Sequence, residues 1–272
     1  KYRVMKKVDL ITGWASEIEK TSGEYLLARK YKVYGTSRNP DRFKTDFPFS
    51  LLQLDVTDIQ SIKGCDALLL EKEARLDVLI NNAGVGITGP LEETPIEEIQ
   101  KAFATNLYGP IQITNEVLPS MRNQKSGHII NITSIAGYMG LPYRGIYSAT
   151  KAALEITTEA YRMELMQFGI QIANVAPGDF ATNIAAGRYH APLRENSPYK
   201  KAYGATLKMM DADVDSGQNP IQMADAVYHI INKKTPKVRY KVGAFLQKFS
   251  IVLKKVLPSK MYEKILMNHY KL

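Results

Sequence analysis

Residues 76–84 read Leu-Asp-Val-Leu-Ile-Asn-Asn-Ala-Gly, a mainly apolar run that ends in two amides and a glycine. A short apolar run closed by turn-forming residues is typical of a strand buried inside a sheet. Similar runs recur along the chain, and helical patterns lie between them, most clearly at 96–121 and 147–168. Strands that alternate with helices predict a parallel sheet covered on both faces. The seven expected strands span 7–11, 32–37, 50–54, 76–80, 128–133, 169–175 and 238–242.

A chain of 272 residues without an internal repeat is long enough for one large α/β domain. We therefore predict a single doubly wound, Rossmann-type domain over residues 1–272, with a mostly parallel seven-stranded sheet. Residues 179–235, with helical patterns at 200–210 and 221–232, are expected to form a lid over the substrate, and a loop without fixed structure is the alternative. Residues 243–272 are expected to extend the domain as basic amphipathic helices.

Turn-forming and polar residues follow six of the expected strands. In a doubly wound sheet, ligands bind beyond the carboxyl ends of the strands. Each of these residues alone has an ordinary explanation as turn chemistry, but six of them at one sheet edge predict a binding site. They are Gly13, Arg38, Asp55, Gly84, Ser134 and Pro177–Gly178.

Tyr147 and Lys151 are four residues apart in an expected helix, so they lie on one face, one turn from each other. An ammonium group close to a phenol stabilises the phenolate and lowers the tyrosine pKa, as a general acid/base near neutral pH requires. The pair alone is weak evidence, because Tyr2 and Lys6 have the same spacing. A surface helix pair is the alternative, and the neighbouring motifs favour the catalytic interpretation.

Several motifs together resemble those of the compact short-chain dehydrogenase/reductase family. The resemblance covers about Met5 to Thr182 and includes the 13-residue gap between Ser134 and Tyr147. It implies an oxidoreductase that transfers hydride between a nicotinamide cofactor and a small-molecule carbonyl or secondary alcohol. The motifs are Thr12–Gly13, Asp55–Val56, Asn81–Gly84, Asn106, Ser134, Tyr147, Lys151, Pro177–Gly178 and Thr182.

The resemblance implies four catalytic residues. Tyr147 would exchange a proton with the substrate oxygen, and Ser134 would donate a hydrogen bond to that oxygen. Lys151 would lower the Tyr147 pKa and bind the nicotinamide ribose. Asn106 would hold a water that links Lys151 to solvent, although a residue at a helix kink before Gly109–Pro110 is the alternative.

The resemblance also implies a set of residues that bind the cofactor. Asp55 would contact the adenine, and Thr182 the nicotinamide carboxamide. No metal is expected, because the four histidines are scattered and have no ligand spacing with Cys65. The expected cofactor-binding residues are Thr12, Gly13, Ser16, Ile18, Arg38, Asp55, Val56, Asn82, Ala83, Gly84, Tyr147, Lys151, Pro177, Gly178 and Thr182.

The end of the second expected strand indicates which cofactor is used. An acid there binds the ribose 2′-hydroxyl of NAD, whereas an arginine accommodates the 2′-phosphate of NADP. The chain reads Thr36-Ser37-Arg38 and has no acid before Asp41. This pattern predicts NADP(H) rather than NAD(H), and a surface ion pair between Arg38 and Asp41 is the alternative.

The phosphate-binding loop departs from the family pattern. The family reads Thr-Gly-x-x-x-Gly-x-Gly, but Glu17 and Glu19 replace the second and third glycines. These glycines let the backbone approach the pyrophosphate, and two carboxylates would repel it. A catalytically impaired relative that acts as a nucleotide sensor or scaffold is therefore the rival hypothesis. NADPH quenching of Trp14 fluorescence would separate the two. A sugar-nucleotide epimerase fits poorly, because it has a different glycine spacing.

The basic charge of the chain is concentrated at one end. The net charge is +9, and residues 239–272 carry eight Lys/Arg and one acid, so they contribute +7 of it. A local basic tail argues against nucleic-acid binding, which favours a basic body with interleaved aromatic residues. The single Cys65 suits a reducing compartment, and neither an apolar run of about 20 residues nor a secretory leader is visible. We expect a cytoplasmic protein.

The basic tail has an apolar stripe with helical spacing, flanked by Lys248, Lys254 and Lys255 and ended by Pro258. It could pack on the body or on a partner subunit, since the resemblance implies a homodimer or homotetramer. The sharper hypothesis is peripheral contact with an anionic membrane. Such contact would suit a lipid-like carbonyl substrate, such as a steroid, a retinoid or a long-chain 3-keto compound. The stripe comprises Phe245, Leu246, Phe249, Val252, Leu253, Val256 and Leu257.

Overall fold

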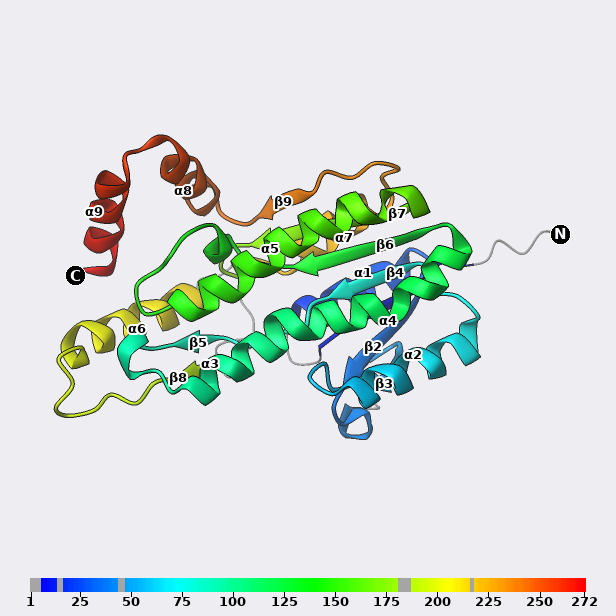
Figure 1. Cartoon of the computed structure of the whole chain (residues 1–272), viewed down its shortest axis with the longest axis horizontal. Helices are drawn as coiled ribbons and strands as arrows, with labels where there is room; N and C mark the ends of the chain where they lie inside the picture. The colour runs from blue at the N-terminus through cyan, green and yellow to red at the C-terminus, as the bar shows by residue number, and fades with distance from the viewer. Residues whose placement is uncertain (1–5, 14–16, 44–46, 181–186, 216–217) are drawn as a thin grey trace.

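The computed structural model describes residues 6–13, 17–43, 47–180, 187–215 and 218–272. Its centre is a seven-stranded sheet in which all neighbouring strands are parallel, in the order β3-β2-β1-β4-β6-β7-β9 (Figure 1). The predicted fold class is confirmed, and every expected strand ends within two residues of the observed one. The strands are β1 (Val8–Ile11), β2 (Lys32–Ser37), β3 (Ser50–Gln53), β4 (Val78–Asn81), β6 (Gly127–Ile132), β7 (Ile170–Pro177) and β9 (Arg239–Val242).

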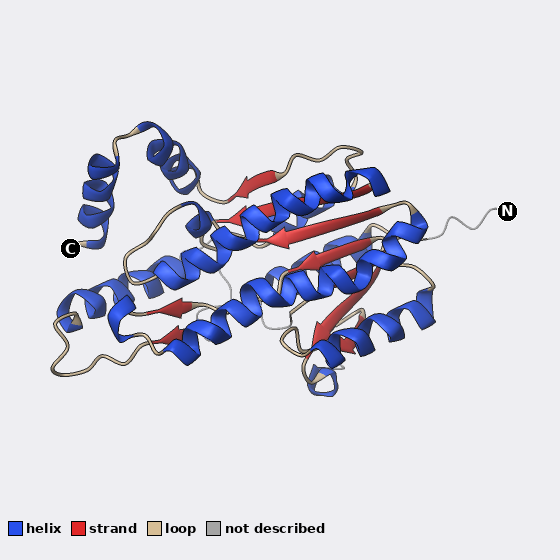
Figure 2. Ribbon diagram, viewed as in Figure 1, coloured by secondary structure: helices blue, strands red, loops and turns tan. Residues whose placement is uncertain are grey.

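Helices cover both faces of the sheet (Figure 2). On one face, α2 (Ile59–Glu73) packs beside α4 (Gly109–Gln124), and α5 (Gly145–Leu165) lies next to them. On the other face, α1 (Glu17–Ala28) packs on α7 (Ile221–Ile231). Each layer buries aliphatic side chains against the strands, which supplies the main stabilising term of the fold.

The helical pattern at 96–121 is not one regular helix. It forms α3 (Ile96–Phe103), a π-helical turn η3 (Ala104–Tyr108) and α4. Pro110 has no backbone N–H, so the carbonyl of Asn106 cannot receive the usual bond from the residue four positions later. The Gly109 amide instead donates to the carbonyl of Ala104, five residues earlier. The wider turn places Asn106 in the interior, where its side chain is fully buried.

The region beyond the carboxyl edge of the sheet contains elements that the sequence pattern did not predict. β5 (Ile87–Thr88) and β8 (Tyr189–His190) form a separate two-stranded parallel sheet. The helix that follows, α6 (Lys200–Asp215), agrees with the helical pattern that the sequence shows at 200–210. In the region predicted as a lid, 179–235, α7 packs against α1 in the core. The lid itself stays a prediction. Four 3-10 helices complete this set: η1 (Pro40–Phe43), η2 (Leu91–Glu93), η4 (Ile135–Tyr138) and η5 (Met166–Phe168).

The C-terminal extension consists of α8 (Phe245–Val256) and α9 (Ser259–Tyr270), as the sequence predicted. Both helices lie at the end of the molecule toward which the strands point (Figure 1). Among the described helices, none combines the length and the hydropathy needed to span a bilayer.

Asp9 is a carboxylate in the centre of the sheet. It lies in β1 between Val33 of β2 and Val78 of β4, and it is fully buried. Neither of its carboxylate oxygens has a hydrogen-bond partner within the described part of the chain. Burial, and secondarily the charge of Asp77, raise the pKa of Asp9 well above its ordinary value, while Lys7 lowers it. An ionised Asp9 therefore destabilises the folded state.

Replacing Asp9 by Val should stabilise the fold by about 1–3 kcal/mol, the usual cost of a buried polar group without a partner. Because the folded-state pKa of Asp9 is raised, its favourable contribution is complete below the ordinary value of 3.8 and is lost as pH rises toward the folded value. Urea unfolding at several pH values measures this. Asp9→Asn keeps the shape but cannot titrate, so unfolding profiles that change equally with pH in wild type and Asp9→Asn would refute the assignment.

Candidate active site

The residues predicted at the strand ends meet at one edge of the sheet (Figure 1). Gly13, Arg38 and Asp55 follow β1, β2 and β3, and Gly84, Ser134 and Gly178 follow β4, β6 and β7. The order of strands reverses between β1 and β4, since β2 and β3 lie on one side and the later strands on the other. Such a switch point is where a doubly wound sheet binds its ligand.

Ser134, Tyr147 and Lys151 come together from two neighbouring elements. Ser134 precedes η4, and the other two residues lie one turn apart in α5. The Lys151 ammonium lies 6.0 Å from the centroid of the Tyr147 ring and donates a 3.0 Å hydrogen bond to the carbonyl of Ile132. All three side chains are buried. Gly137 permits this arrangement, because a Cβ there would lie only 3.0 Å from the carbonyl carbon of Lys151.

The pKa of Tyr147 differs from the sequence-based expectation. Burial raises the pKa of Tyr147, while the Arg144 guanidinium, a hydrogen bond with Ser134 and the charge of Arg188 lower it. The net shift is upward, opposite to the direction that the Tyr–Lys spacing suggested, and a lowering of this pKa by Lys151 stays a prediction. Lys151 is itself buried, which lowers its own pKa to about 8, and its ammonium is engaged with a backbone carbonyl.

Asn106 connects the π-helical turn to the catalytic helix. Its Oδ1 accepts from the amide of Val85 at 2.8 Å, and its Nδ2 donates to the carbonyl of Val85 at 2.9 Å and to Thr150 Oγ1 at 3.1 Å. A Cβ built on Gly84 would lie 3.3 Å from both Asn106 Oδ1 and Lys151 Nζ. The glycine after β4 therefore leaves a small space that both polar groups border.

The turns after β1 and β4 form a polar cradle. Thr12 Oγ1 accepts hydrogen bonds from the amides of Asn82 and Ala83 at 3.1 and 3.2 Å. Gly13 donates its amide to Thr36 Oγ1 at 3.1 Å and has a φ of 90°. A Cβ there would lie 2.7 Å from Ala83 Cα, so this position requires glycine. The cradle fits the close backbone approach that a dinucleotide needs.

Glu19 enters this cradle. Its side chain is buried, and its carboxylate accepts a hydrogen bond from Asn82 Nδ2. Glu19 Oε1 lies 2.6 Å from the position of a Cβ on Gly13. The acid at the third-glycine position thus lies between the ends of β1 and β4, on the path that a pyrophosphate would take across the switch point. At this position the chain does not fit the cofactor as well as it does at the catalytic end.

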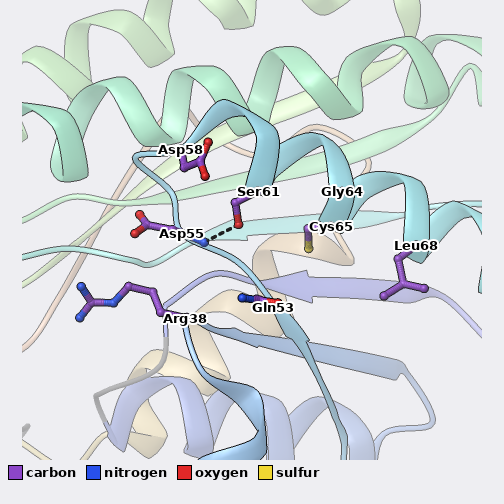
Figure 3. A pocket seen from close by; sticks show the side chains of 8 residues that line it. All are labelled: Arg38, Gln53, Asp55, Asp58, Ser61, Gly64, Cys65 and Leu68. Carbon is purple, nitrogen blue, oxygen red and sulfur yellow. Dashed lines mark hydrogen bonds between the residues drawn. The ribbon is translucent and has the colours of Figure 1, made fainter.

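A cavity of about 560 Å³ lies beyond the ends of β2 and β3 (Figure 3). Arg38 and Asp55 are among the residues that line it. Burial raises the pKa of Asp55, but the hydrogen bonds from Thr57 and, to a lesser extent, the charge of Arg38 lower it, so the net shift is downward. Ser61 Oγ fixes the backbone of the turn by accepting the Asp55 amide at 2.9 Å. Val56 is buried next to Gly109, where a Cβ would lie 2.8 Å from the Val56 carbonyl oxygen.

Some predicted residues can be followed only in part. Ser16 and Thr182 lie outside the described residues, as does Trp14, and for Ile18 only the backbone in α1 is described. Pro177 ends β7, and the Gly178 amide donates to the carbonyl of Val242 at 2.8 Å, so this turn is fixed to the start of the C-terminal extension.

The sequence analysis missed a buried polar network behind the site. Glu155, one turn after Lys151 in α5, accepts from Thr133 Oγ1 at 2.5 Å, from Tyr138 at 3.2 Å and from Arg239 at 2.9 Å. This carboxylate therefore holds the segment around Ser134 and β9 against the catalytic helix. An acid at a helical position normally indicates a surface residue, and only its i, i+4 spacing from Lys151 could have suggested an inward orientation.

A doubly wound sheet with a glycine cradle at the switch point and a buried Ser–Tyr–Lys group defines a nicotinamide-dependent oxidoreductase. The chain belongs to the short chain dehydrogenase family, whose model matches residues 7–192. Solved structures with a similar fold include complexes with NAD and with NADP.

Three known proteins show how far the similarity extends. The chain is 36% identical to 3-ketodihydrosphingosine reductase of Bacteroides thetaiotaomicron, over 94% of this chain and 95% of the relative. It is 30% identical to NADPH-dependent 3-dehydrocapnine reductase of Ornithobacterium rhinotracheale, over 94% of each chain. A short-chain dehydrogenase structure from Streptomyces avermitilis superposes with a TM-score of 0.80 at 30% identity and covers 97% of this chain and 99% of its own.

Proposed function

We propose that this protein is an NADP(H)-dependent reductase of a long-chain 3-keto lipid. The observation that carries the proposal is the burial of Ser134, Tyr147 and Lys151 together at the carboxyl edge of the sheet, where Lys151 and Asn106 also border the space at Gly84. The bound dinucleotide would supply the hydride. The residues of this chain would place the carbonyl, hold its oxygen and deliver the proton.

Each catalytic side chain has a distinct role in this proposal. Tyr147 would give its hydroxyl proton to the carbonyl oxygen, and Ser134 would donate a hydrogen bond to that oxygen as negative charge develops on it. Lys151 would bind the nicotinamide ribose and return a proton to Tyr147. Asn106, next to the space at Gly84, would hold a water between Lys151 and solvent. The hydrogen bonds of Asn106 to Val85 support a fixed position for such a water.

The pKa of Tyr147 favours reduction over oxidation. Because burial raises it, the hydroxyl keeps its proton at neutral pH and is ready to act as an acid. Alcohol oxidation would require the phenolate, which forms only as pH rises toward the raised pKa. The protonated hydroxyl is the form that can donate to a ketone oxygen near pH 7.

The surroundings of Tyr147 favour an apolar substrate. Tyr147 packs in a cluster with Ile87, Ala102 and Ala136, and Leu141 and Tyr189 lie against it. Two relatives, at 36% and 30% identity, are named as reductases of 3-ketodihydrosphingosine and 3-dehydrocapnine. The apolar surroundings suit any lipid-like ketone, and the names of these two relatives favour a long-chain 3-keto compound over a steroid or a retinoid.

A panel of ketones with NADPH tests this function. Loss of NADPH absorbance should be fastest with a long-chain 3-keto substrate and slower with a short, water-soluble ketone, and Tyr147→Phe serves as the blank. The proposal fails if no ketone of either length is reduced above the blank. A preference for the short ketone would overturn the substrate class but not the reductase activity.

Arg38 is the residue that would select NADP(H). It lies at the end of β2, exposed to the cavity of Figure 3, and its charge acts on Asp55 across that cavity. A 2′-phosphate at this position would gain a charge-assisted hydrogen bond, whereas the 2′-hydroxyl of NAD would not. We therefore propose NADP(H) rather than NAD(H) as the cofactor.

Replacing Arg38 by Ala should weaken NADPH binding by roughly 10- to 150-fold, since hydrogen bonds to charged groups contribute about 1.5–3 kcal/mol. NADH binding should change little. Fluorescence titration measures both affinities. Arg42→Ala, in the neighbouring η1, removes the same charge outside the residues that line the cavity and should leave both unchanged. Equal losses for NADH and NADPH, or no loss, would contradict the assignment.

One observation favours a second candidate function. The Glu19 carboxylate lies between Gly13 and Asn82, where it opposes a pyrophosphate. A relative that has lost turnover could still act as a nucleotide sensor or scaffold. NADPH binding without turnover would favour the sensor, and absence of NADPH binding at millimolar concentration would favour the scaffold, whereas turnover of any ketone would exclude both.

We also propose a cytoplasmic location and assembly as a homodimer or homotetramer. The single Cys65 is buried, and burial raises the pKa of its thiol to about 12, so it is a poor candidate for a disulfide. Light scattering of the purified protein tests the assembly directly.

A further inference from the structure

The C-terminal helices are fixed to the wall of the candidate active site. α8 packs on η4, the segment that directly follows Ser134. Its buried Ile251 joins Ile135 and Met139 of that segment in one apolar cluster, which Tyr262 of α9 completes. The two helices therefore form a defined surface next to the catalytic residues rather than a loose tail.

Polar contacts lock the same helices to the turn after β7. Gln247 Nε2 donates to Asp179 Oδ2 at 2.5 Å, and the Asp179 amide donates back to Gln247 Oε1 at 3.1 Å. At the start of the extension, Arg239 lies 2.9 Å from Glu155 and 2.8 Å from Glu159. Glu155 and Glu159 of α5 thus hold β9, the strand that directly precedes α8.

The outward face of α8 is apolar. Phe245, Leu246 and Val256 are 72%, 76% and 75% exposed. Phe249 and Val252 are less exposed, at 41% and 46%. Four of these residues follow i, i+4, i+7, i+11 spacing and form one stripe. The Phe245 and Phe249 rings stack with centroids 5.7 Å apart.

α9 also exposes apolar side chains. Met261 and Ile265, one turn apart, are 55% and 41% exposed, while Tyr262 and Tyr270 face inward. We call the exposed apolar residues of α8 and α9 the apolar platform: Phe245, Leu246, Phe249, Val252, Val256, Met261 and Ile265. An apolar surface of this kind in a monomer indicates an interaction site.

The charges beside the apolar platform identify its partner. Lys248 and Lys255 flank the stripe of α8, and Lys260 and Lys264 lie beside Met261 and Ile265 at the same helical offset. Residues 239–272 carry eight Lys/Arg and one acid. A second copy of this surface would bring like charges together, which is unfavourable. An anionic surface that also accepts apolar side chains is the complementary partner.

We propose that the apolar platform docks on an anionic phospholipid bilayer and places the active-site mouth at that surface. The phenylalanine and aliphatic side chains enter the boundary between headgroups and acyl chains, and the lysines contact the anionic headgroups. The docking itself does not depend on catalysis. Its consequence, delivery of the lipid ketone from the bilayer, rests on the proposed reductase function.

Vesicle sedimentation tests the docking. The full chain should sediment with vesicles of phosphatidylserine and phosphatidylcholine, and much less with phosphatidylcholine alone. Lys248→Ala/Lys255→Ala should weaken the partition about thirtyfold, since each lysine near the surface contributes about fivefold. Phe245→Ser/Phe249→Ser should abolish it. Met163→Ser, at a 70% exposed apolar residue of α5, is the matched control and should change nothing.

Two results would overturn the docking. One is equal sedimentation with charged and uncharged vesicles, or sedimentation that the lysine and phenylalanine variants leave unchanged. The other is a dimer in light scattering that Phe245→Ser/Phe249→Ser dissociates, because a second copy would then cover the platform. Circular dichroism confirms that the variants are folded.

Turnover separates the docking from the proposed function. Anionic vesicles should speed reduction of a long-chain ketone dissolved in them at least tenfold relative to the Phe245→Ser/Phe249→Ser variant, and should leave reduction of a short soluble ketone unchanged. Sedimentation without turnover of either ketone would keep the docking and reject the reductase. Turnover of the short ketone without sedimentation would keep the reductase and reject the docking.

Discussion

Replacing Tyr147 by Phe should lower the turnover of NADPH-dependent ketone reduction by about 10²- to 10⁴-fold, the usual contribution of a positioned general acid. The change removes only the hydroxyl, so the packing of the ring with Ile87 and Ala136 is retained. NADPH affinity should therefore stay within a few-fold of the wild-type value. Stopped-flow turnover and fluorescence titration measure the two quantities separately.

Tyr161→Phe is the matched control for this prediction. Tyr161 lies in the same helix, is half-buried and donates its hydroxyl to Asn115 Oδ1 at 2.7 Å. It lies outside the residues gathered at the sheet edge, so its loss should leave turnover nearly unchanged. If Tyr147→Phe kept more than a tenth of the wild-type turnover, the tyrosine would not be the proton donor.

The pH dependence provides a second test of the same residue. Burial raises the pKa of Tyr147, so this residue stays protonated around neutral pH. Its titration should therefore leave the rate of reduction unchanged near pH 7 and lower it only at alkaline pH. Oxidation of the alcohol should rise over the same range. Arg144 lowers the Tyr147 pKa, so Arg144→Met should move both alkaline limbs to higher pH.

The sheet and the edge where the site forms could be predicted from the sequence because both depend on local patterns. Buried parallel strands are short apolar runs, and their carboxyl ends need turn residues such as Gly13 and Gly84. These positions lie at one edge once the strands are parallel. The fold therefore followed from local patterns, whereas the grouping of Ser134, Tyr147 and Lys151 as one site rested on the family resemblance as well.

The parts that could not be predicted depend on contacts between distant residues. Glu155 is buried only because Thr133, Tyr138 and Arg239 surround it, and no local pattern identifies those partners. The pKa of Tyr147 depends on burial, which outweighs the charge that the Tyr–Lys spacing suggested. The two-residue strands β5 and β8 are too short for any periodicity.

Glu19→Gly should tighten NADPH binding by between about fivefold and nearly a thousandfold. A like-charge contact at 4 Å costs about 1 kcal/mol in water and about 4 kcal/mol at an effective dielectric of 20. The Glu19 carboxylate is buried and is held by Asn82 next to Gly13, so the effective dielectric of 20 describes it better than water does. We therefore expect a result in the upper half of this range by fluorescence titration.

Two further variants separate charge from shape at this position. Glu19→Gln removes the charge and keeps the side chain, so it should recover most of the affinity if repulsion dominates, and little if the side chain blocks the path. Glu24→Gly, at an exposed position of α1, makes the same change in net charge and helix propensity and should not alter NADPH affinity. Equal tightening in Glu19→Gly and Glu24→Gly would mean that only net charge matters. If Glu19→Gly gains affinity and turnover together, the cradle is a weakened cofactor site; if it gains affinity without turnover, the sensor hypothesis becomes the better account of the chain.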